Sequence, residues 1–170
     1  SMLKSAGIRL PTKICVHGFV TINGLKMSKS RGTFILARDY LDNLDPDFLR
    51  YYYACKLSNS AEDLDLNLED FVQKINSDLV GKVVNLASRC SKFITKGNDG
   101  YLHSEIDDKE LWNIFSQSAT TISENYENRN FSKATREIIK LTDLANEYIS
   151  DKQPWVLNKD CLLYTSPSPR

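Results

Sequence analysis

The sequence predicts a mostly α-helical protein, in which a short α/β unit near the N-terminus is followed by an antiparallel helix bundle. Three observations predict this fold class. Apolar residues alternate at period two over residues 13–22, as in a strand. A polar stretch that contains two glycines follows at 23–33. Beyond residue 45, apolar residues recur at spacings of three and four, as on one face of a helix.

The strand expected over 13–22 has apolar residues on both of its faces, so we expect it to be covered on both sides, as in a layered α/β unit. Asn23 and Gly24 come next, and both accept positive φ, which predicts a tight turn. Residues 26–33 are too polar and too rich in small side chains to lie in a core. They are predicted to form an exposed loop.

Caps and periodicity predict the helices. Asp45 can cap a helix that starts at Pro46, and the acidic stretch 58–65 that follows is typical of a loop. The longest periodic segment covers about 68–95 and predicts a long helix. Two further helices are expected, over about 108–127 and about 132–150.

The last two helices carry more specific predictions. Asp107 and Glu110 have the spacing of a capping box, and Trp112 is expected in the core. The side chains expected to be buried on the last helix are Ala134, Ile138, Leu141, Ala145 and Tyr148. Residues 161–170 lack any helical period and are interpreted as a non-native tail.

Composition excludes several classes of protein. Hydrophobic residues make up 41% and charged residues 26%, the balance of a soluble globular protein. No apolar run reaches the roughly 18 residues that a membrane span needs. The four cysteines form no C-x-x-C pair, so neither a zinc knuckle nor a disulfide framework is predicted, and a cytoplasmic location is expected.

The charges are balanced in total but segregated along the chain. The 22 basic and 22 acidic residues give a formal net charge of zero, which argues against a uniformly basic nucleic-acid binder. Residues 38–70 contain nine acids and three bases, whereas residues 71–96 contain five bases and one acid. Such an arrangement is expected where one surface meets phosphate and its neighbour does not.

The strongest functional signal is the stretch Lys26-Met27-Ser28-Lys29-Ser30, on the loop that follows the tight turn. Its two ammonium groups can neutralise charge that builds on a departing pyrophosphate, while hydroxyls and backbone N–H groups hold the oxygens. A flexible loop suits a step that closes over a nucleotide and then reopens. Without further context, a solvated basic turn explains the same residues.

Further stretches supply that context. The residues Lys26–Ser30 are identical to the second signature, KMSKS, of the class I aminoacyl-tRNA synthetases, and other parts of the chain resemble the methionyl-tRNA synthetase family. The matching stretches are 17–24, 31–35, 49–53, 63–71, 84–89 and 143–146. The resemblance extends from about residue 8 to 160. It implies that Lys26 and Lys29 contact the phosphates of ATP, bound with magnesium, while Ser28 and Ser30 shape the loop.

The resemblance also implies an anticodon-reading site for CAU. Asn85 and Arg89 match the anticodon-contacting pair of the family, and at i and i+4 they share one helix face. An amide and a guanidinium can together read the edges of unstacked bases. Pro154 ends the preceding helix, so that Trp155 can stack on the first anticodon base. An ordinary solvated helix face and a core tryptophan are the alternatives that the residues alone leave open.

By this resemblance, residues 1–22 end a Rossmann-type catalytic domain, and 23–66 form the signature loop and the stem-contact region. Residues 67–160 form a truncated anticodon-binding bundle. The partners implied are tRNA(Met), ATP and methionine. The first class I signature, the methionine pocket and the zinc-bearing insertion do not occur in this sequence. We therefore expect zinc in a longer parent only, no metal ligands here, and no ligase activity from this segment alone. A non-catalytic tRNA-binding module is the alternative, and the oligomeric state stays open.

Overall fold

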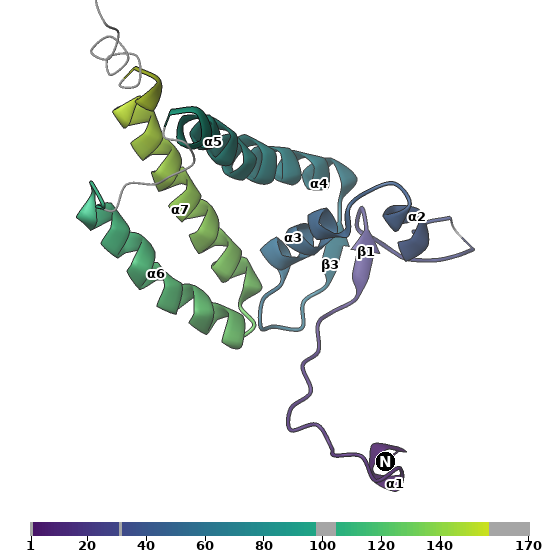
Figure 1. Ribbon diagram of the computed structural model, residues 1–170. Helices are drawn as coiled ribbons and strands as arrows, with labels where there is room; N and C mark the ends of the chain where they lie inside the picture. The colour runs from purple at the N-terminus through teal and green to yellow at the C-terminus, as the bar shows by residue number, and fades with distance from the viewer. Residues whose placement is uncertain (1, 31, 98–104, 157–170) are drawn as a thin grey trace, which may run out of the picture.

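The computed structural model describes residues 2–30, 32–97 and 105–156, except the side chains of residues 96 and 97 (Figure 1). It is mostly helical with a small three-stranded sheet, which confirms the predicted fold class at this level. The elements in chain order are α1 (Met2–Ser5), β1 (Val20–Ile22), β2 (Leu25–Lys26), α2 (Ala37–Leu41), α3 (Pro46–Lys56), β3 (Leu64–Leu66), α4 (Leu68–Lys74), η1 (Ile75–Val84), α5 (Asn85–Gly97), α6 (Lys109–Glu127) and α7 (Phe131–Lys152). The predicted tail at 161–170, and the part of the predicted bundle beyond residue 156, lie outside the described residues.

The sheet has the strand order β2-β1-β3, with β1 antiparallel to β2 and parallel to β3. Asn23 and Gly24 join β1 to β2 with φ of 49° and 74°, which confirms the predicted tight turn. The prediction of a loop over 58–65 was wrong at its end. Leu64 and Leu66 point into the core on either side of Asp65, the period-two pattern of a strand with one buried face.

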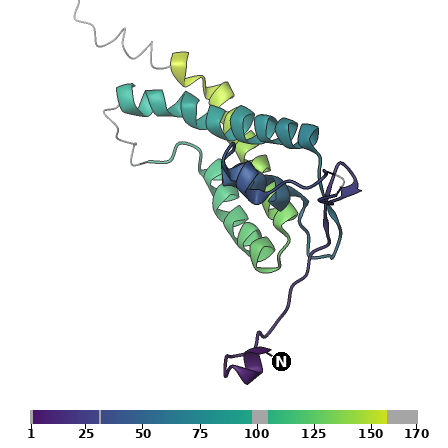
Figure 2. The same cartoon turned by 90° about the vertical axis from the view of Figure 1, so that its right-hand side faces the viewer.

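The predicted strand over 13–22 forms only at Val20–Ile22. The register of β1 against β3 starts at the pair Val20–Leu64, and residues 13–19 pair with no strand in the described part of the chain. Ile14 is 77% exposed, so the predicted cover on both faces was wrong for this segment. The segment extends away from the sheet toward α1 (Figures 1 and 2).

The core lies where α3, the sheet and α4 meet. The predicted cap is confirmed, since the Asp45 side chain accepts a hydrogen bond from the Asp47 N–H at 2.8 Å and Pro46 starts α3. Tyr52 on α3 is fully buried, and its ring meets the ring of Phe71 edge-on, with the centroids 5.4 Å apart. The core cluster consists of Ile22, Tyr52, Leu66, Phe71 and Ile75.

The predicted helix over 68–95 is confirmed as one continuous helical segment, but its middle third, η1, is π-helical. The Asn85 N–H bonds back to the Val80 carbonyl, five residues earlier, at the end of η1. Inside η1, the Cβ of any residue in place of Gly81 would lie 3.1 Å from the Asn76 carbonyl oxygen. The spacing of apolar residues in the sequence cannot distinguish this wider π-helical turn from an α-helical one.

The helices α6 and α7 confirm the two last predicted helices and correct several of their details. Asp108 caps α6 by accepting from the Leu111 N–H at 2.8 Å, so the predicted cap was one residue early. Asp107 instead binds Lys152 at 2.9 Å, because it faces α7. Trp112 is 56% exposed, so its predicted place in the core was wrong.

Of the predicted buried stripe of α7, Ala134 is buried and Ile138 is exposed. The other three positions, Leu141, Ala145 and Tyr148, are half-buried, and the prediction missed Thr135, which is buried beside Ala134. Thr135 can be buried because its hydroxyl donates within the helix, to the carbonyls of Phe131 and Ser132. The helix α7 packs between α6 and the segment η1–α5 (Figure 1). None of the helices seen in the described residues combines the length and the apolar character needed to cross a bilayer.

Candidate functional site

The signature loop is anchored at both ends. It leaves the sheet through β2, and Met27 packs against the core cluster, although the sequence predicted the whole stretch as exposed. Thr33 closes the loop, because its N–H donates to the Ser28 carbonyl at 3.2 Å and its hydroxyl accepts from the Ser28 N–H at 3.1 Å. The same hydroxyl donates to the Lys26 carbonyl at 3.2 Å. The loop is therefore a closed turn on a short β-hairpin.

Asp65 holds the hairpin from the neighbouring strand. Its Oδ1 accepts from the Gly24 N–H and from the Thr21 hydroxyl, each at 2.7 Å. The hydrogen bond from Gly24, and then that from Thr21, hold the pKa of the Asp65 carboxyl below its usual range. Asp65 was quoted only within a matching stretch in the sequence analysis, with no role, because its partners lie 41 and 44 residues away.

The loop presents two ammonium groups and two hydroxyls toward solvent. Lys26 Nζ lies 5.5 Å from the centroid of the Phe19 ring, and Lys29 Nζ lies 5.4 Å from that of Phe34. The hydroxyl oxygens of Ser28 and Ser30 are 3.0 Å apart. Both lysines are exposed, so their cationic heads stay hydrated while the aromatic rings restrict their stems. Chemically, this arrangement can bind a polyphosphate.

The second group of predicted residues lies at the first turns of α5 and just beyond the end of α7. Arg89 and Trp155 are 66 positions apart in the sequence, and the guanidinium carbon lies 5.1 Å from the centroid of the indole. A guanidinium nitrogen of Arg89 also donates to the Ser150 hydroxyl at 3.3 Å. Asn85 is exposed at the start of α5, one helical turn before Arg89. Trp155 is 36% exposed, so part of its ring is open to a ligand.

Two contacts between η1 and α7 support this end and were missed by the sequence analysis. Lys82 and Asp143 form an ion pair at 2.7 Å. The Asn146 side-chain amide donates to the Lys82 carbonyl at 3.2 Å and to the Thr142 carbonyl at 3.0 Å. Asp143 and Asn146 lie in the matching stretch 143–146, which was the signal that pointed to them.

The strand β1, which precedes the signature loop, lies at the opposite end of the helical region from α5 and the end of α7, and α3 and α4 lie between them (Figure 1). The structure thus groups the seven predicted site residues into two separate sites, Lys26–Ser30 at one end and Asn85, Arg89 and Trp155 at the other. In the described part of the chain, no group of three His, Cys, Asp or Glu side chains could hold a metal ion.

Comparison with known proteins identifies the family. Residues 1–91 match the family described as "tRNA synthetases class I (M)", which is more than half of the 170 residues. The chain belongs to the class I tRNA synthetases (M). This confirms the family that the signature loop and the matching stretches predicted.

Solved structures of a class I synthetase agree with the family match. A structure of Mycobacterium tuberculosis methionyl-tRNA synthetase in complex with methionyl-adenylate aligns with a TM-score of 0.78 and 30% identity, over 98% of this chain and 32% of that one. A second structure of that enzyme with methionyl-adenylate aligns with a TM-score of 0.78 and 31% identity, over 92% of this chain and 31% of that one. The apo form aligns with a TM-score of 0.73 and 28% identity, over 92% of this chain and 30% of that one. This synthetase chain therefore spans about a third of the length of the solved structures.

Proposed function

We propose that this chain is part of a methionine–tRNA ligase, which activates methionine with ATP to methionyl-adenylate and transfers it to tRNA(Met). Residues 1–22 end the Rossmann-type catalytic domain, 23–66 carry the signature loop and contact the tRNA stem, and 67–160 belong to the anticodon-binding bundle. In this proposal, Lys26 and Lys29 contact the ATP phosphates. Asn85, Arg89 and Trp155 recognise the CAU anticodon.

The Arg89–Trp155 contact carries the anticodon part of the proposal. A guanidinium stacked on an indole is a preformed planar surface, and an unstacked base can stack on such a surface while a neighbouring amide reads its edge. Asn85 supplies an exposed amide one turn away on the same helix. The two elements were predicted separately, from 85–89 and from 154–155, and they meet at one place.

The closed signature loop supports the ATP part. Thr33 and Met27 fix where the loop starts and ends, while Lys26 and Lys29 remain exposed at its surface. Ammonium groups at such a position can stabilise the charge that develops on pyrophosphate as the α-phosphorus is attacked. An ordered loop of this composition has no evident use in a non-catalytic tRNA-binding module, so the ligase is the better-supported reading.

The test is a binding titration at fixed salt with two anticodon stem-loops, one carrying CAU and one with the first anticodon base replaced. Circular dichroism first establishes that the helices are formed. We expect the chain to prefer the CAU loop, and Trp155→Ala to lose about 5- to 150-fold in affinity for it, the range that one base-stacking contact gives.

The matched control is Trp112→Ala, which removes an exposed tryptophan of α6 and is expected to leave the preference intact. Equal, strongly salt-dependent binding of both loops by a folded chain would mean generic attraction to phosphate, and would remove the roles proposed for Asn85, Arg89 and Trp155.

A further inference from the structure

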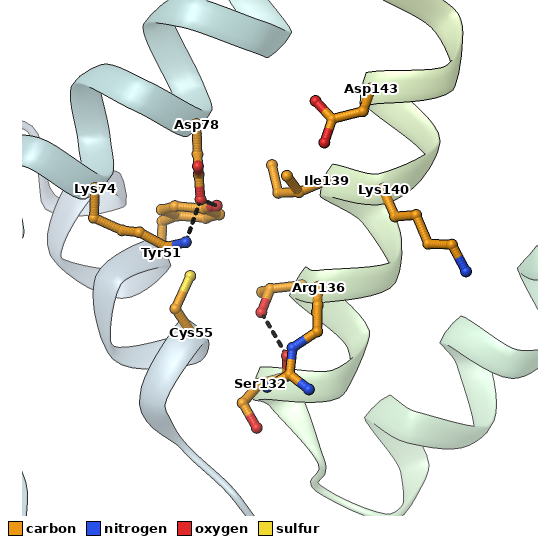
Figure 3. Close-up of a pocket in the computed structure, with 10 residues that line it drawn as sticks. Tyr51, Cys55, Lys74, Asp78, Ser132, Arg136, Ile139, Lys140 and Asp143 are labelled. Carbon is orange, nitrogen blue, oxygen red and sulfur yellow. Dashed lines mark hydrogen bonds and ion pairs between the residues drawn. The ribbon is translucent and has the colours of Figure 1, made fainter.

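Asp78, in the middle of η1, is the buried charged residue in the described part of the chain, with 4% of its surface exposed. It borders a cleft of about 380 Å³ between α3, the segment α4–η1 and α7 (Figure 3). Neither the signature loop nor the Arg89–Trp155 pair uses this residue. A buried carboxylate is costly to desolvate, so its partners indicate why it is there.

The partners of Asp78 come from α3, from α4 and from η1 itself. Its Oδ2 accepts from the Tyr51 hydroxyl of α3 at 2.6 Å and from Lys74 Nζ of α4 at 2.7 Å. Its Oδ1 accepts from the hydroxyl of the adjacent Ser77 at 3.1 Å. Burial raises the pKa of Asp78, but the hydrogen bonds from Lys74 and Tyr51 outweigh this, and the net pKa is below the usual range. The carboxylate is therefore charged and fully engaged.

Helix stability alone does not account for this arrangement. Lys74 precedes Asp78 by four residues, and this order of charges is the less favourable one for an i, i+4 pair because it opposes the helix dipole. Among the hydrogen bonds that Asp78 accepts, the one from Tyr51 spans the longest stretch of sequence, 27 residues. In Figure 3, the Tyr51 ring lies beside the Asp78 carboxylate, and the labelled residues of α7 line the opposite side of the cleft.

The Tyr51–Asp78 bond lies at the junction of two regions. We define the loop unit as residues 20–75, which contain the whole core cluster, and the bundle as residues 76–97 and 109–152. Tyr51 precedes Tyr52, which is fixed in the core of the loop unit. Asp78 lies on the segment that continues into α5 and its Arg89. A second junction contact is a backbone bond, from the Ser132 N–H of α7 to the Leu57 carbonyl at 2.8 Å.

We propose that Asp78 is a positioning residue that, through Tyr51, fixes the angle at which the bundle leaves the loop unit. A ligand that binds both the signature loop and the anticodon end must bridge two sites at a set separation, and its affinity falls when their geometry no longer allows simultaneous contact. The part of this inference that concerns tRNA rests on the function proposed above. The part that concerns the orientation of the two regions is independent of that function.

The first test measures orientation directly, by residual dipolar couplings of backbone amides in the loop unit and in the bundle. The wild-type couplings are expected to fit a single alignment tensor. In Asp78→Asn and in Tyr51→Phe, each region should fit its own tensor while the joint fit fails. Asp47→Asn is the matched control, because it removes one partner of an exposed i, i+3 pair on α3. A single, unchanged tensor in Tyr51→Phe, which removes only a hydroxyl and retains the packing, would overturn the proposal.

The second test compares a full-length tRNA that carries a CAU anticodon with the isolated CAU stem-loop. We expect Asp78→Asn and Tyr51→Phe to weaken binding of the full tRNA by about tenfold and binding of the stem-loop by less than about twofold. An equal loss for both ligands would mean that the bundle itself is damaged and would overturn the positioning role. If the wild type shows no preference for CAU, the proposed function fails, and the dipolar couplings still decide the role of Asp78.

Discussion

The loop unit and the bundle are held together in different ways. Aromatic and aliphatic side chains are buried inside the loop unit, between α3, the sheet and α4, with Tyr52 fully enclosed. In α6, which is described throughout, no residue is buried, and in α7 the buried residues are Ala134 and Thr135. Polar contacts join the helices near the Arg89–Trp155 pair, namely Lys82–Asp143 and Arg89–Ser150.

This difference indicates where the free energy of folding is concentrated. Burial of apolar surface contributes more per residue than partly exposed ion pairs and hydrogen bonds, whose net contributions are about 0–1 kcal/mol each. The loop unit therefore supplies most of the stability, and the bundle supplies a surface whose geometry depends on polar contacts. Four predictions test this comparison, from the largest expected effect to the smallest.

Replacement of the most buried side chain should have the largest effect. Tyr52→Ala leaves a cavity in the core and removes the hydroxyl that donates to Asp70 Oδ2 at 2.7 Å. We expect it to lower the free energy of unfolding by about 3–5 kcal/mol, measured by urea denaturation. Tyr126→Ala in α6, at a tyrosine that is 43% exposed, should cost about 1 kcal/mol. Equal costs would contradict the proposed difference between the two regions.

Gly18 tests how tightly the chain packs just before β1. A Cβ at this position would overlap the backbone of Glu62 and Asp63, because the Gly18 N–H donates to the Glu62 carbonyl at 3.1 Å. Gly18→Ala should lower the free energy of unfolding by about 1–3 kcal/mol in the same urea assay. Ile14→Ala is the control, since it lies in the same segment before β1 with 77% of its surface exposed, and it should leave the urea midpoint unchanged.

Arg89→Lys tests the anticodon site proposed at the Arg89–Trp155 pair without a change in charge. The substitution keeps the cation but loses the planar group on Trp155 and the bond to Ser150. We expect a loss of about 1 kcal/mol in affinity for the CAU stem-loop, with an unchanged salt dependence. Lys92→Ala, at an exposed lysine of α5, should instead reduce the salt dependence for both loops alike. An Arg89→Lys variant that binds as wild type would exclude a stacking role.

The smallest expected effect is a pH dependence of the stability of the loop unit, caused by Asp65. Its pKa is lower in the folded chain than in the unfolded one, so its stabilising contribution is fully present above the unfolded pKa of about 3.9. The contribution is lost as the pH falls from that value through the folded pKa. An NMR titration of the Asp65 carboxyl should give a pKa below the usual value. Unfolding of Asp65→Asn should depend less on pH in this range, and an identical dependence would exclude the hairpin contact as the cause.

Local sequence predicted those features whose causes are local. The turn at Asn23 and Gly24, the cap at Asp45 and the extents of the last two helices follow from residues within a few positions of one another. The signature loop was identified in the same way, from five consecutive residues. Its anchoring by Met27 was not predicted, because the contacts of that side chain come from core residues distant in the sequence.

The errors have tertiary causes. Apolar residues do alternate over 13–22, but a strand also needs a partner strand, and the pairing with β3 starts only at Val20. The capping-box spacing favoured Asp107 over Asp108, but Asp107 contacts Lys152 of α7 and Asp108 forms the cap. Asn85, Arg89 and Trp155 were selected by resemblance, whereas the contact between Arg89 and Trp155 could be found only in the folded chain.

Two side-chain contacts between η1–α5 and α7 share the same spacing, since Lys82–Asp143 and Arg89–Ser150 each join residues 61 positions apart. The two helical segments run in the same direction, so each such contact depends on the number of residues between its partners along each helix. Insertions in the connection before α6 leave the pairing intact, whereas a single deletion within α7 rotates every later residue by about 100° and shifts it by about 1.5 Å. Length variation among relatives should therefore be tolerated between these helices and excluded within them.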